Sequence, residues 1–154
     1  MTHVQDSATI TADPLTVYAM LTDITRMGEW SPENCGGRWL GQAAGPAAGA
    51  RFVGRNRKGR LRWSTVCTVT AADPGHVFAF TVKALGLTVS QWSYVFEDAK
   101  GGCVVTERWT DRRPAAARSL GDLVMGVRDR GEHNLAGIRT TLANVKSAAE
   151  SVSA

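Results

Sequence analysis

Glu107 is the residue whose setting most suggests acid–base chemistry, because it lies inside a predicted strand between Val105 and Trp109. A carboxyl group buried in an apolar pocket has a raised pKa and could serve as a general acid or base. Two other settings are open from the sequence: a salt bridge with an arginine such as Arg55 or Arg62, or exposure to solvent. Glu107 is therefore a candidate catalytic residue whose environment the sequence leaves undecided.

His133 is the second candidate for moving a proton, and it lies in an amphipathic segment near the C-terminus. Its ring could point toward a cavity or into solvent, and the nearby Asp129 and Glu132 are expected on a solvated face. The sequence contains no nucleophile elbow, phosphate-binding glycine loop or dinucleotide fingerprint. No group of potential ligands has metal-binding spacing. We expect neither a metal nor a cofactor, and enzymatic activity is left open.

Three cysteines, Cys35, Cys67 and Cys103, cannot all pair within one chain, and none belongs to a Cys-x-x-Cys motif. Each lies in or beside a predicted strand, where we expect it to be a small buried hydrophobic residue. Free cysteines are typical of a reducing compartment. The first residues lack the pattern of a signal peptide, and no apolar run approaches the ~20 residues of a membrane span. We expect a cytoplasmic protein with no membrane span.

The composition is that of one globular domain over residues 1–154, with 44% hydrophobic and 21% charged residues. A chain of this length buries roughly two-thirds of its surface, enough for a core and a cavity. The net charge is +4, and five basic residues surround a predicted hairpin turn at residues 58–59: Arg55, Arg57, Lys58, Arg60 and Arg62. They are expected to form a solvated hairpin tip, with an anionic partner as the alternative. No nucleic-acid partner is expected, because no recognisable nucleic-acid-binding pattern accompanies them.

The elements that would position these residues begin with a strand over residues 3–11. Asp13-Pro14 then has the pattern of a helix start, and a second short helical segment is expected over 23–31. From about residue 34 to 112 the chain is expected to form successive strands, over 51–57, 62–72, 76–83, 87–97 and 102–112, with a loop at 41–49. Because no helices separate these strands, an antiparallel sheet is predicted.

Pro114 is expected to open one long amphipathic helix. Because glycine disfavours a helix interior, its glycines indicate either a break, near Gly126 or Gly131, or a close approach to the sheet. Side-chain alternation places sets of strand residues on common faces. These sets are Phe52, Gly54 and Asn56; Trp92, Tyr94 and Phe96; and Cys103, Val105, Glu107 and Trp109. If Trp92 and Glu107 both face inward, a cavity would have aromatic walls and one acid. The alternative is that the aromatic residues are ordinary core.

The order β-α-α-β6-α resembles that of the START-like helix-grip superfamily (SRPBCC), in its polyketide cyclase/dehydrase and lipid-transport group. The matching stretches include Ala12-Asp13-Pro14 with Val17-Tyr18, Asp23 to Pro32, Gly49 to Phe52, Asp73-Pro74-Gly75, Phe78-Ala79-Phe80, Trp92-Ser93-Tyr94, residues 101–107, and Leu142 to Lys146. The resemblance covers nearly the whole chain. It implies an α+β fold in which a curved antiparallel sheet of six to seven strands wraps around a long C-terminal helix.

The resemblance further implies a cavity between sheet and helix that binds a hydrophobic or amphipathic small molecule, lipid-like or polyketide-like. The expected ligand-binding residues are Tyr18, Trp30, Phe52, Phe80, Trp92, Tyr94, Glu107, Trp109, Val124 and Val127, with Glu107 and His133 as candidate catalytic residues. One alternative is a polyketide cyclase or dehydratase in which Glu107 or His133 moves a proton. The other is a protein-interaction or regulatory module, and a homodimer is also left open.

Overall fold

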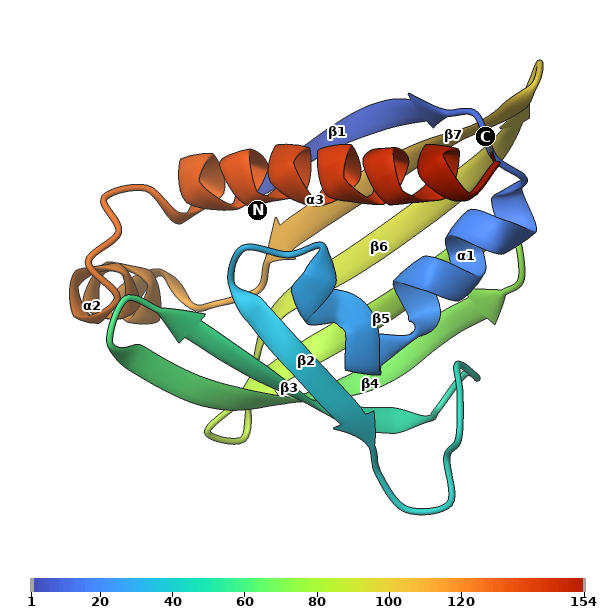
Figure 1. Cartoon of the computed structure of the whole chain (residues 1–154). Coiled ribbons are helices and arrows are strands. Elements are labelled where there is room, and N and C mark those ends of the chain that lie inside the picture. Colours follow the sequence, from blue (N-terminus) through green and yellow to red (C-terminus); the bar gives the residue numbers. More distant parts are fainter. Residues whose placement is uncertain (1, 154) are drawn as a thin grey trace.

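The computed structural model describes residues 2–153, and Figure 1 shows the path of the chain. Its elements are β1 (His3–Ile10), α1 (Pro14–Thr22), the 3-10 helix η1 (Ile24–Glu29), β2 (Asn34–Trp39), β3 (Arg51–Lys58), β4 (Leu61–Asp73), β5 (Val77–Ala84), β6 (Leu87–Ala99), β7 (Gly102–Asp111), α2 (Ala115–Val124) and α3 (Arg130–Ser153). The predicted strands are confirmed, with ends that differ by a few residues.

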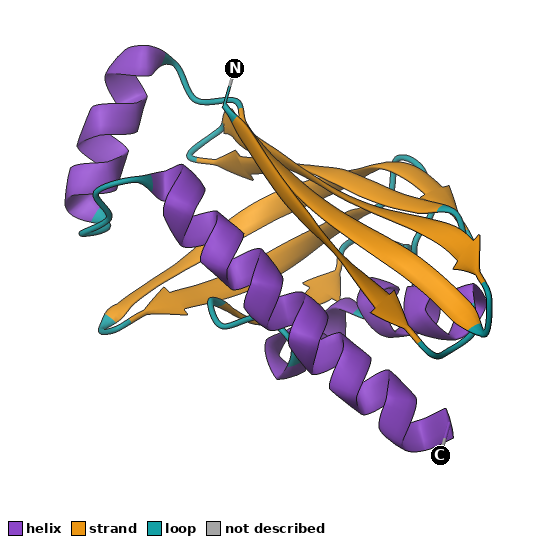
Figure 2. Cartoon of the chain, turned by 90° about the horizontal axis from the view of Figure 1, so that it is seen from above, coloured by secondary structure: helices purple, strands orange, loops and turns teal. Residues whose placement is uncertain are grey.

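The seven strands form one antiparallel sheet in the order β1-β7-β6-β5-β4-β3-β2. Helix α3 crosses one face of this curved sheet, and α1 and η1 cover the same face nearer its other end (Figures 1 and 2). The predicted α+β helix-grip fold is confirmed. The helices and the sheet enclose the space in which a site can form.

The first helix begins where the sequence predicts it. The Asp13 carboxylate accepts a hydrogen bond from the Leu15 N–H at 2.7 Å, and Pro14 occupies the first helical position, where no N–H is needed. Val17 and Leu21 are buried on one face of the helix. The Tyr18 ring lies edge-on to Phe96, with 5.5 Å between ring centroids. This end of the sheet is therefore filled by side chains.

The C-terminal segment is two helices rather than one, and the break falls at Gly126. Gly126 has a φ of +64°, a left-handed conformation that favours glycine. Its N–H donates to Leu123, and the following Val127 N–H donates to Asp122 at 2.8 Å, which is the hydrogen-bond pattern of a Schellman helix end. The chain then turns, and Asp129 caps α3 by accepting the Gly131 N–H at 2.8 Å. The turn lets α3 cross the sheet while α2 lies at its edge.

We predict that Gly102→Ala destabilises the fold by about 1–3 kcal/mol, as overpacked buried sites do. A Cβ at Gly102 would overlap the carbonyl oxygen of Ile10, so strands β1 and β7 would have to separate. Gly45→Ala is the matched control, because nothing lies within 4 Å of its Cβ position. Urea unfolding measures both variants. Equal stabilities for the two would contradict the close approach of β1 and β7.

Candidate functional site

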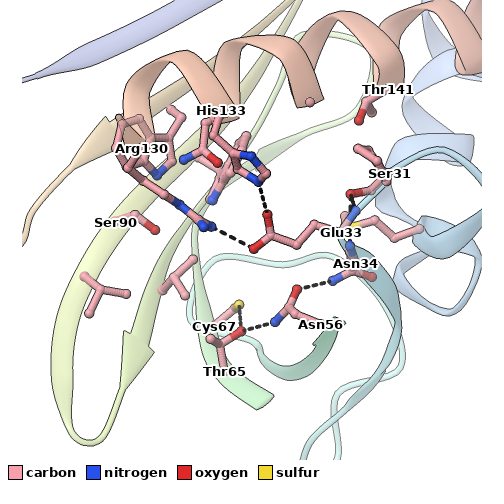
Figure 3. Close-up of a pocket in the computed structure, with 18 of the residues that line it drawn as sticks. Ser31, Glu33, Asn34, Asn56, Thr65, Cys67, Ser90, Arg130, His133 and Thr141 are labelled. Carbon is pink, nitrogen blue, oxygen red and sulfur yellow. Dashed lines mark hydrogen bonds and ion pairs between the residues drawn. The ribbon is translucent and has the colours of Figure 1, made fainter. Parts of the chain in front are cut away.

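A cavity of about 480 Å³ lies between the sheet and the first half of α3. Strands β3 to β7 supply its wall on the sheet side, and Gly121 of α2 and Met125, just after α2, bound it at one end. Its apolar and aromatic lining includes Met27, Phe52, Trp63, Phe80, Val82, Val89, Trp92, Trp109 and Met125. Its polar lining includes Ser31, Asn34, Asn56, Thr65, Ser90, Tyr94, Glu107, Asn134 and Thr141, several of which Figure 3 shows. The cavity combines flat apolar walls with scattered polar groups.

The strand register explains the aromatic wall. Phe80 on β5 is paired with Trp92 on β6, and Trp92 is paired with Trp109 on β7. Directly opposite residues of an antiparallel sheet project from the same face, so these three rings form one row across the sheet. Phe52 approaches Phe80 with 5.2 Å between ring centroids and extends the wall toward β3. The alternation predicted for these strands is confirmed.

Glu107 is the acid of this cavity. Only 2% of the residue is exposed, and its Oε1 accepts a hydrogen bond from the Tyr94 hydroxyl at 2.8 Å. Oε2 has no hydrogen-bond partner among residues 2–153. Burial raises the pKa of Glu107 to about 8, against a smaller lowering effect of the Tyr94 hydrogen bond. Burial likewise raises the pKa of Tyr94 well above its usual value, with the neighbouring Glu107 as a further cause.

The two alternative environments predicted for Glu107, exposure to solvent and a salt bridge with an arginine, are wrong. The residue is not exposed, and its partner is Tyr94 rather than Arg55 or Arg62. Both arginines are exposed, because they lie on the face of β3 and β4 that points away from the cavity. A carboxyl group in this setting is protonated at neutral pH and can donate a hydrogen bond.

His133 points toward the cavity and is held by a carboxylate from a distant part of the chain. Its Nε2 lies 3.0 Å from Oε2 of Glu33, and Arg130 donates to the other Glu33 oxygen at 2.7 Å (Figure 3). Glu33 lies between η1 and β2, so these contacts connect that segment to the first turns of α3. The predicted solvated face is confirmed for Asp129 and Glu132, which are both exposed, and Asp129 also caps the helix.

A chain of polar side chains crosses β2, β3 and β4 at the opposite wall (Figure 3). Asn34 Nδ2 donates to Asn56 Oδ1 at 3.3 Å, and Asn56 Nδ2 contacts Thr65 Oγ1 at 3.5 Å. The Thr65 hydroxyl in turn lies 3.9 Å from the Cys67 sulfur. These groups satisfy one another, so this wall is polar but internally hydrogen-bonded.

Helix α2 is attached at the cavity edge by an ion-pair cluster. Arg113 contacts Asp111 at 2.9 Å and Asp122 of α2 at 2.8 Å. Burial disfavours ionisation of Asp111, but the hydrogen bonds from Arg113 outweigh it and hold the pKa of this carboxyl below its usual value. The Lys58 ammonium also donates to the Met125 carbonyl oxygen at 2.9 Å. Polar contacts thus tie α2 to β7 and to the β3–β4 turn.

The predicted site residues divide into two groups. Those that line the cavity are Phe52, Phe80, Trp92, Tyr94, Glu107, Trp109 and His133. Tyr18, Trp30, Val124 and Val127 lie outside its lining. Tyr18 packs at the α1 end, and Trp30 is buried beside Arg26, whose guanidinium lies 5.1 Å from the ring centroid. Val124 is 64% exposed on α2, and Val127 is buried in the turn after it.

The cysteine prediction is wrong for one residue. Cys67 and Cys103 are buried, but Cys35 is exposed, because the β2–β3 pairing is irregular between Asn34 and Gly36 and interrupts the simple alternation. Burial raises the pKa of Cys67 to about 12, so its thiol is not ionised at neutral pH. Cys67 also lines the cavity.

Several cavity residues were not predicted from the sequence. On α3 they are Arg130, Asn134, Gly137 and Thr141, which with His133 follow spacings of three and four residues. This spacing marks one face of a helix, and the stripe is a signal that could have been used. Trp63 and Thr65 share a face of β4 with buried Cys67, and alternation could have found them as well. Glu33 carries no such local signal.

Within residues 2–153, no group of three or more His, Cys, Asp or Glu side chains is arranged to hold a metal ion. None of the helices in this part of the chain is both long enough and apolar enough to cross a membrane.

The sequence profile of the family described as polyketide cyclase / dehydrase and lipid transport matches residues 1–150. The chain belongs to this family. A polyketide-cyclase-like protein of Corynebacterium glutamicum, solved by NMR, is 32% identical to this family member, with 96% of this chain and 91% of that chain covered and a TM-score of 0.66. No curated protein shows significant sequence similarity to the chain.

More distant solved structures share the fold of this polyketide cyclase/dehydrase family member. A protein of Chromobacterium violaceum is 13% identical, with a TM-score of 0.73 and coverage of 97% of this chain and 99% of that chain. The di-domain ARO/CYC StfQ, from the steffimycin biosynthetic pathway, is 16% identical with a TM-score of 0.75. The match covers 98% of this chain and 51% of StfQ. Identities this low support a common fold alone.

Proposed function

We propose that this protein binds a hydrophobic or amphipathic small molecule, polyketide-like or lipid-like, in the cavity between sheet and α3. The observation that carries the proposal is the cavity of about 480 Å³ with its row of aromatic rings. This volume lies within the usual range for small-molecule sites, which combine apolar walls with a few placed polar groups. Membership in the polyketide cyclase/dehydrase and lipid-transport family supports the same binding function.

The experiment is organic extraction and mass spectrometry of freshly purified protein, followed by tryptophan-quenching titrations with 2-ethylnaphthalene and 2-acetylnaphthalene. Trp63, Trp92 and Trp109 line the cavity, so an occupant should alter their fluorescence. Ser90→Phe is the blocked variant, because Ser90 is buried on the cavity wall. We expect wild-type protein to carry a bound molecule or to take up a probe. The affinity for the probe should be at least tenfold lower in Ser90→Phe. If wild-type protein carries nothing and takes up neither probe, the proposal is wrong.

A cyclase or dehydratase is the second candidate, and it is favoured by two groups on the cavity wall that could move protons. Protonated Glu107 could donate to a substrate carbonyl oxygen while His133, oriented by Glu33, accepts a proton from an adjacent carbon. Loss of water from a poly-β-ketone thioester, followed by mass spectrometry, would measure such a reaction. Glu107→Gln should abolish turnover and keep binding; unchanged turnover would remove Glu107 from the mechanism.

A protein-interaction role is the remaining candidate, and it rests on α2. Leu120, Leu123 and Val124 are 64%, 78% and 64% exposed there, although large apolar side chains are usually buried. Replacing all three by serine should abolish any partner captured reproducibly by the wild-type protein. A capture that the triple variant retains would count against this role for α2.

A further inference from the structure

Exposed apolar side chains gather at one end of the sheet. Because the strands are antiparallel, the β3–β4 turn, the β5–β6 turn and the segment after β7 all lie at this end, toward the left of Figure 1. Six of the ten large apolar side chains that are exposed within residues 2–153 belong to these three segments: Leu61, Leu85, Leu87, Leu120, Leu123 and Val124. We call these six residues the apolar rim. Such a concentration of exposed apolar surface marks an interaction site.

Leu85, at the β5–β6 turn, is the most exposed member of the apolar rim. Its side chain projects fully into solvent, and its φ of +51° lies in the left-handed region. Within residues 2–153 it is the only residue other than glycine in that region. A bulky side chain is unfavourable in this conformation, and turns usually place glycine or asparagine there. A leucine at this position indicates a contact made outside the chain.

Helix α2 carries the second part of the apolar rim. Leu120, Leu123 and Val124 follow spacings of three and four residues, so they form one stripe, and no residue of α2 is buried. The Lys58 ammonium, at the end of β3, donates to the Met125 carbonyl oxygen just after α2 at 2.9 Å. This contact holds the β3–β4 hairpin and α2 together. A short helix held with its apolar stripe outward is typical of proteins that lie on a lipid surface.

Cations without acidic partners surround the apolar rim. Five of them are exposed on its three segments or beside them: Arg57, Arg60, Arg62, Lys83 and Arg128. None of the five forms an ion pair within residues 2–153. Arg57 lies directly opposite Arg62 across β3 and β4, and like charges in this position destabilise a sheet unless a counter-charge is supplied.

The distribution of acidic residues reinforces this charge. Residues 34–72, which include β2, β3 and most of β4, contain no Asp or Glu. The opposite end of the sheet carries a group of exposed acidic side chains, at the β4–β5 turn, the β6–β7 turn and the start of α1: Asp13, Asp73, Glu97 and Asp98. This separation of charge would turn the apolar rim toward an anionic surface.

We propose that this end of the protein docks on an anionic lipid surface, with the apolar rim among the headgroups and the five cations against lipid phosphates. Burial of apolar side chains and attraction to anionic lipids both favour such binding. The leucines project from two turns and a helix rather than from one flat face, which suits a soft lipid interface better than a closely fitted protein surface. The inference goes beyond the proposed binding function and does not depend on it.

The apolar rim borders the cavity. Leu85 follows Ala84 in the chain, and Leu120 precedes Gly121, and both Ala84 and Gly121 line the cavity. Met125, just after α2, lines it as well. A docked molecule would therefore hold this end of its cavity against the lipid surface.

The test is co-sedimentation with vesicles of phosphatidylcholine, with and without about 30% phosphatidylglycerol as the anionic lipid. Wild-type protein should bind the anionic vesicles about tenfold more tightly than the neutral ones. Leu85→Ser/Leu123→Ser should bind the anionic vesicles about tenfold more weakly than wild type, because two leucines no longer leave water. Leu15→Ser/Val152→Ser is the matched control, because these residues are 58% and 82% exposed on α1 and at the end of α3, away from the apolar rim. It should bind like wild type.

A second pair of variants tests the cations. Replacing Arg57, Arg60 and Arg62 by glutamine should lower the affinity for anionic vesicles about fivefold per residue. The matched control replaces three exposed cations away from this end by glutamine: Arg51, Lys100 and Arg108. Its loss should be much smaller, because salt screens charges that lie more than about 10 Å from the lipid surface.

A fluorescent label reports which end meets the lipid. Cys35, the one exposed cysteine of the three, is first replaced by serine. An environment-sensitive fluorophore on Leu85→Cys should then shift its emission to the blue when anionic vesicles are added. The same fluorophore on Val152→Cys should show no shift, since the end of α3 lies away from the apolar rim.

The outcomes are decisive for the docking proposal alone. Wild-type protein that does not bind anionic vesicles would overturn it, and so would equal binding to both kinds of vesicle. Binding that Leu85→Ser/Leu123→Ser retains in full would also overturn it. Absence of vesicle binding, together with a partner protein that the triple serine variant of α2 loses, would assign the apolar rim to a protein instead. The proposed cavity function stands or falls separately, on extraction and probe titration.

Discussion

Glu107→Gln should raise the free energy of unfolding at pH 9 by about 5 kcal/mol and leave it nearly unchanged at pH 4. The folded protein raises the pKa of this carboxyl from 4.5 to about 8, because the residue is buried. A tenfold difference in proton affinity corresponds to about 1.4 kcal/mol, which gives the size of the effect. Glutamine keeps an oxygen to accept the Tyr94 hydroxyl and removes the ionisable group.

The sign follows from which state binds the proton. Between pH 4.5 and about 8 the unfolded chain loses the Glu107 proton while the folded protein retains it. The free energy of unfolding of wild type therefore falls as pH rises through this window. The full loss of stability due to Glu107 is reached above pH 8. Urea unfolding of both proteins from pH 4 to 9 measures it, because other titrating groups cancel in the difference. A difference that does not vary with pH would contradict a buried, protonated Glu107.

Asp111→Ala should destabilise the protein by about 3 kcal/mol and loosen α2. Asp111 is 3% exposed and binds Arg113, which also holds Asp122 on α2. Removing one member of a buried ion pair leaves the other charge incompletely paired, and this costs about 3–5 kcal/mol where no second partner remains. Because Arg113 keeps its contact with Asp122, the expected destabilisation lies at the lower end of this range. Hydrogen exchange should show faster exchange in residues 115–124.

Asp6→Ala is the matched control for this prediction. It breaks the Asp6–Arg139 ion pair, in which the side chains are 38% and 64% exposed. Exposed ion pairs contribute about 0–1 kcal/mol, so the control should remain close to wild type. The Asp111 effect should also diminish at low pH, because protonation removes the charge that the wild-type pair depends on. Equal losses in both variants would show that the Asp111 cluster does not anchor α2.

The sequence was sufficient to predict which strand side chains share a face. Alternation depends only on the local backbone, so it predicts one common face for Glu107 and Trp109 on β7 and one common face for Tyr94 and Phe96 on β6. Their common burial confirms that assignment. The start of α1 was equally local, since Asp13 and Pro14 act within one helical turn.

The position along a face was not predictable in this way. Tyr18 has the aromatic character of a cavity residue, but α1 packs it against Phe78 and Phe96 at the filled end of the sheet. Val124 fits the apolar pattern of a buried helix, yet the turn at Gly126 leaves it on an exposed helix. Both outcomes depend on how a helix crosses the sheet, which no local pattern specifies.

The sequence by itself determined the elements, their antiparallel pairing and which side chains of a strand share a face, because propensity, capping and alternation act over a few residues. Tertiary structure decided what those faces enclose. It brought Glu33 within 3.0 Å of His133, across 100 residues of chain, and surrounded Glu107 with enough apolar material to keep its proton at neutral pH. A local pattern fixes a side chain's direction, but its hydrogen-bond partners and its desolvation depend on every element that packs around it.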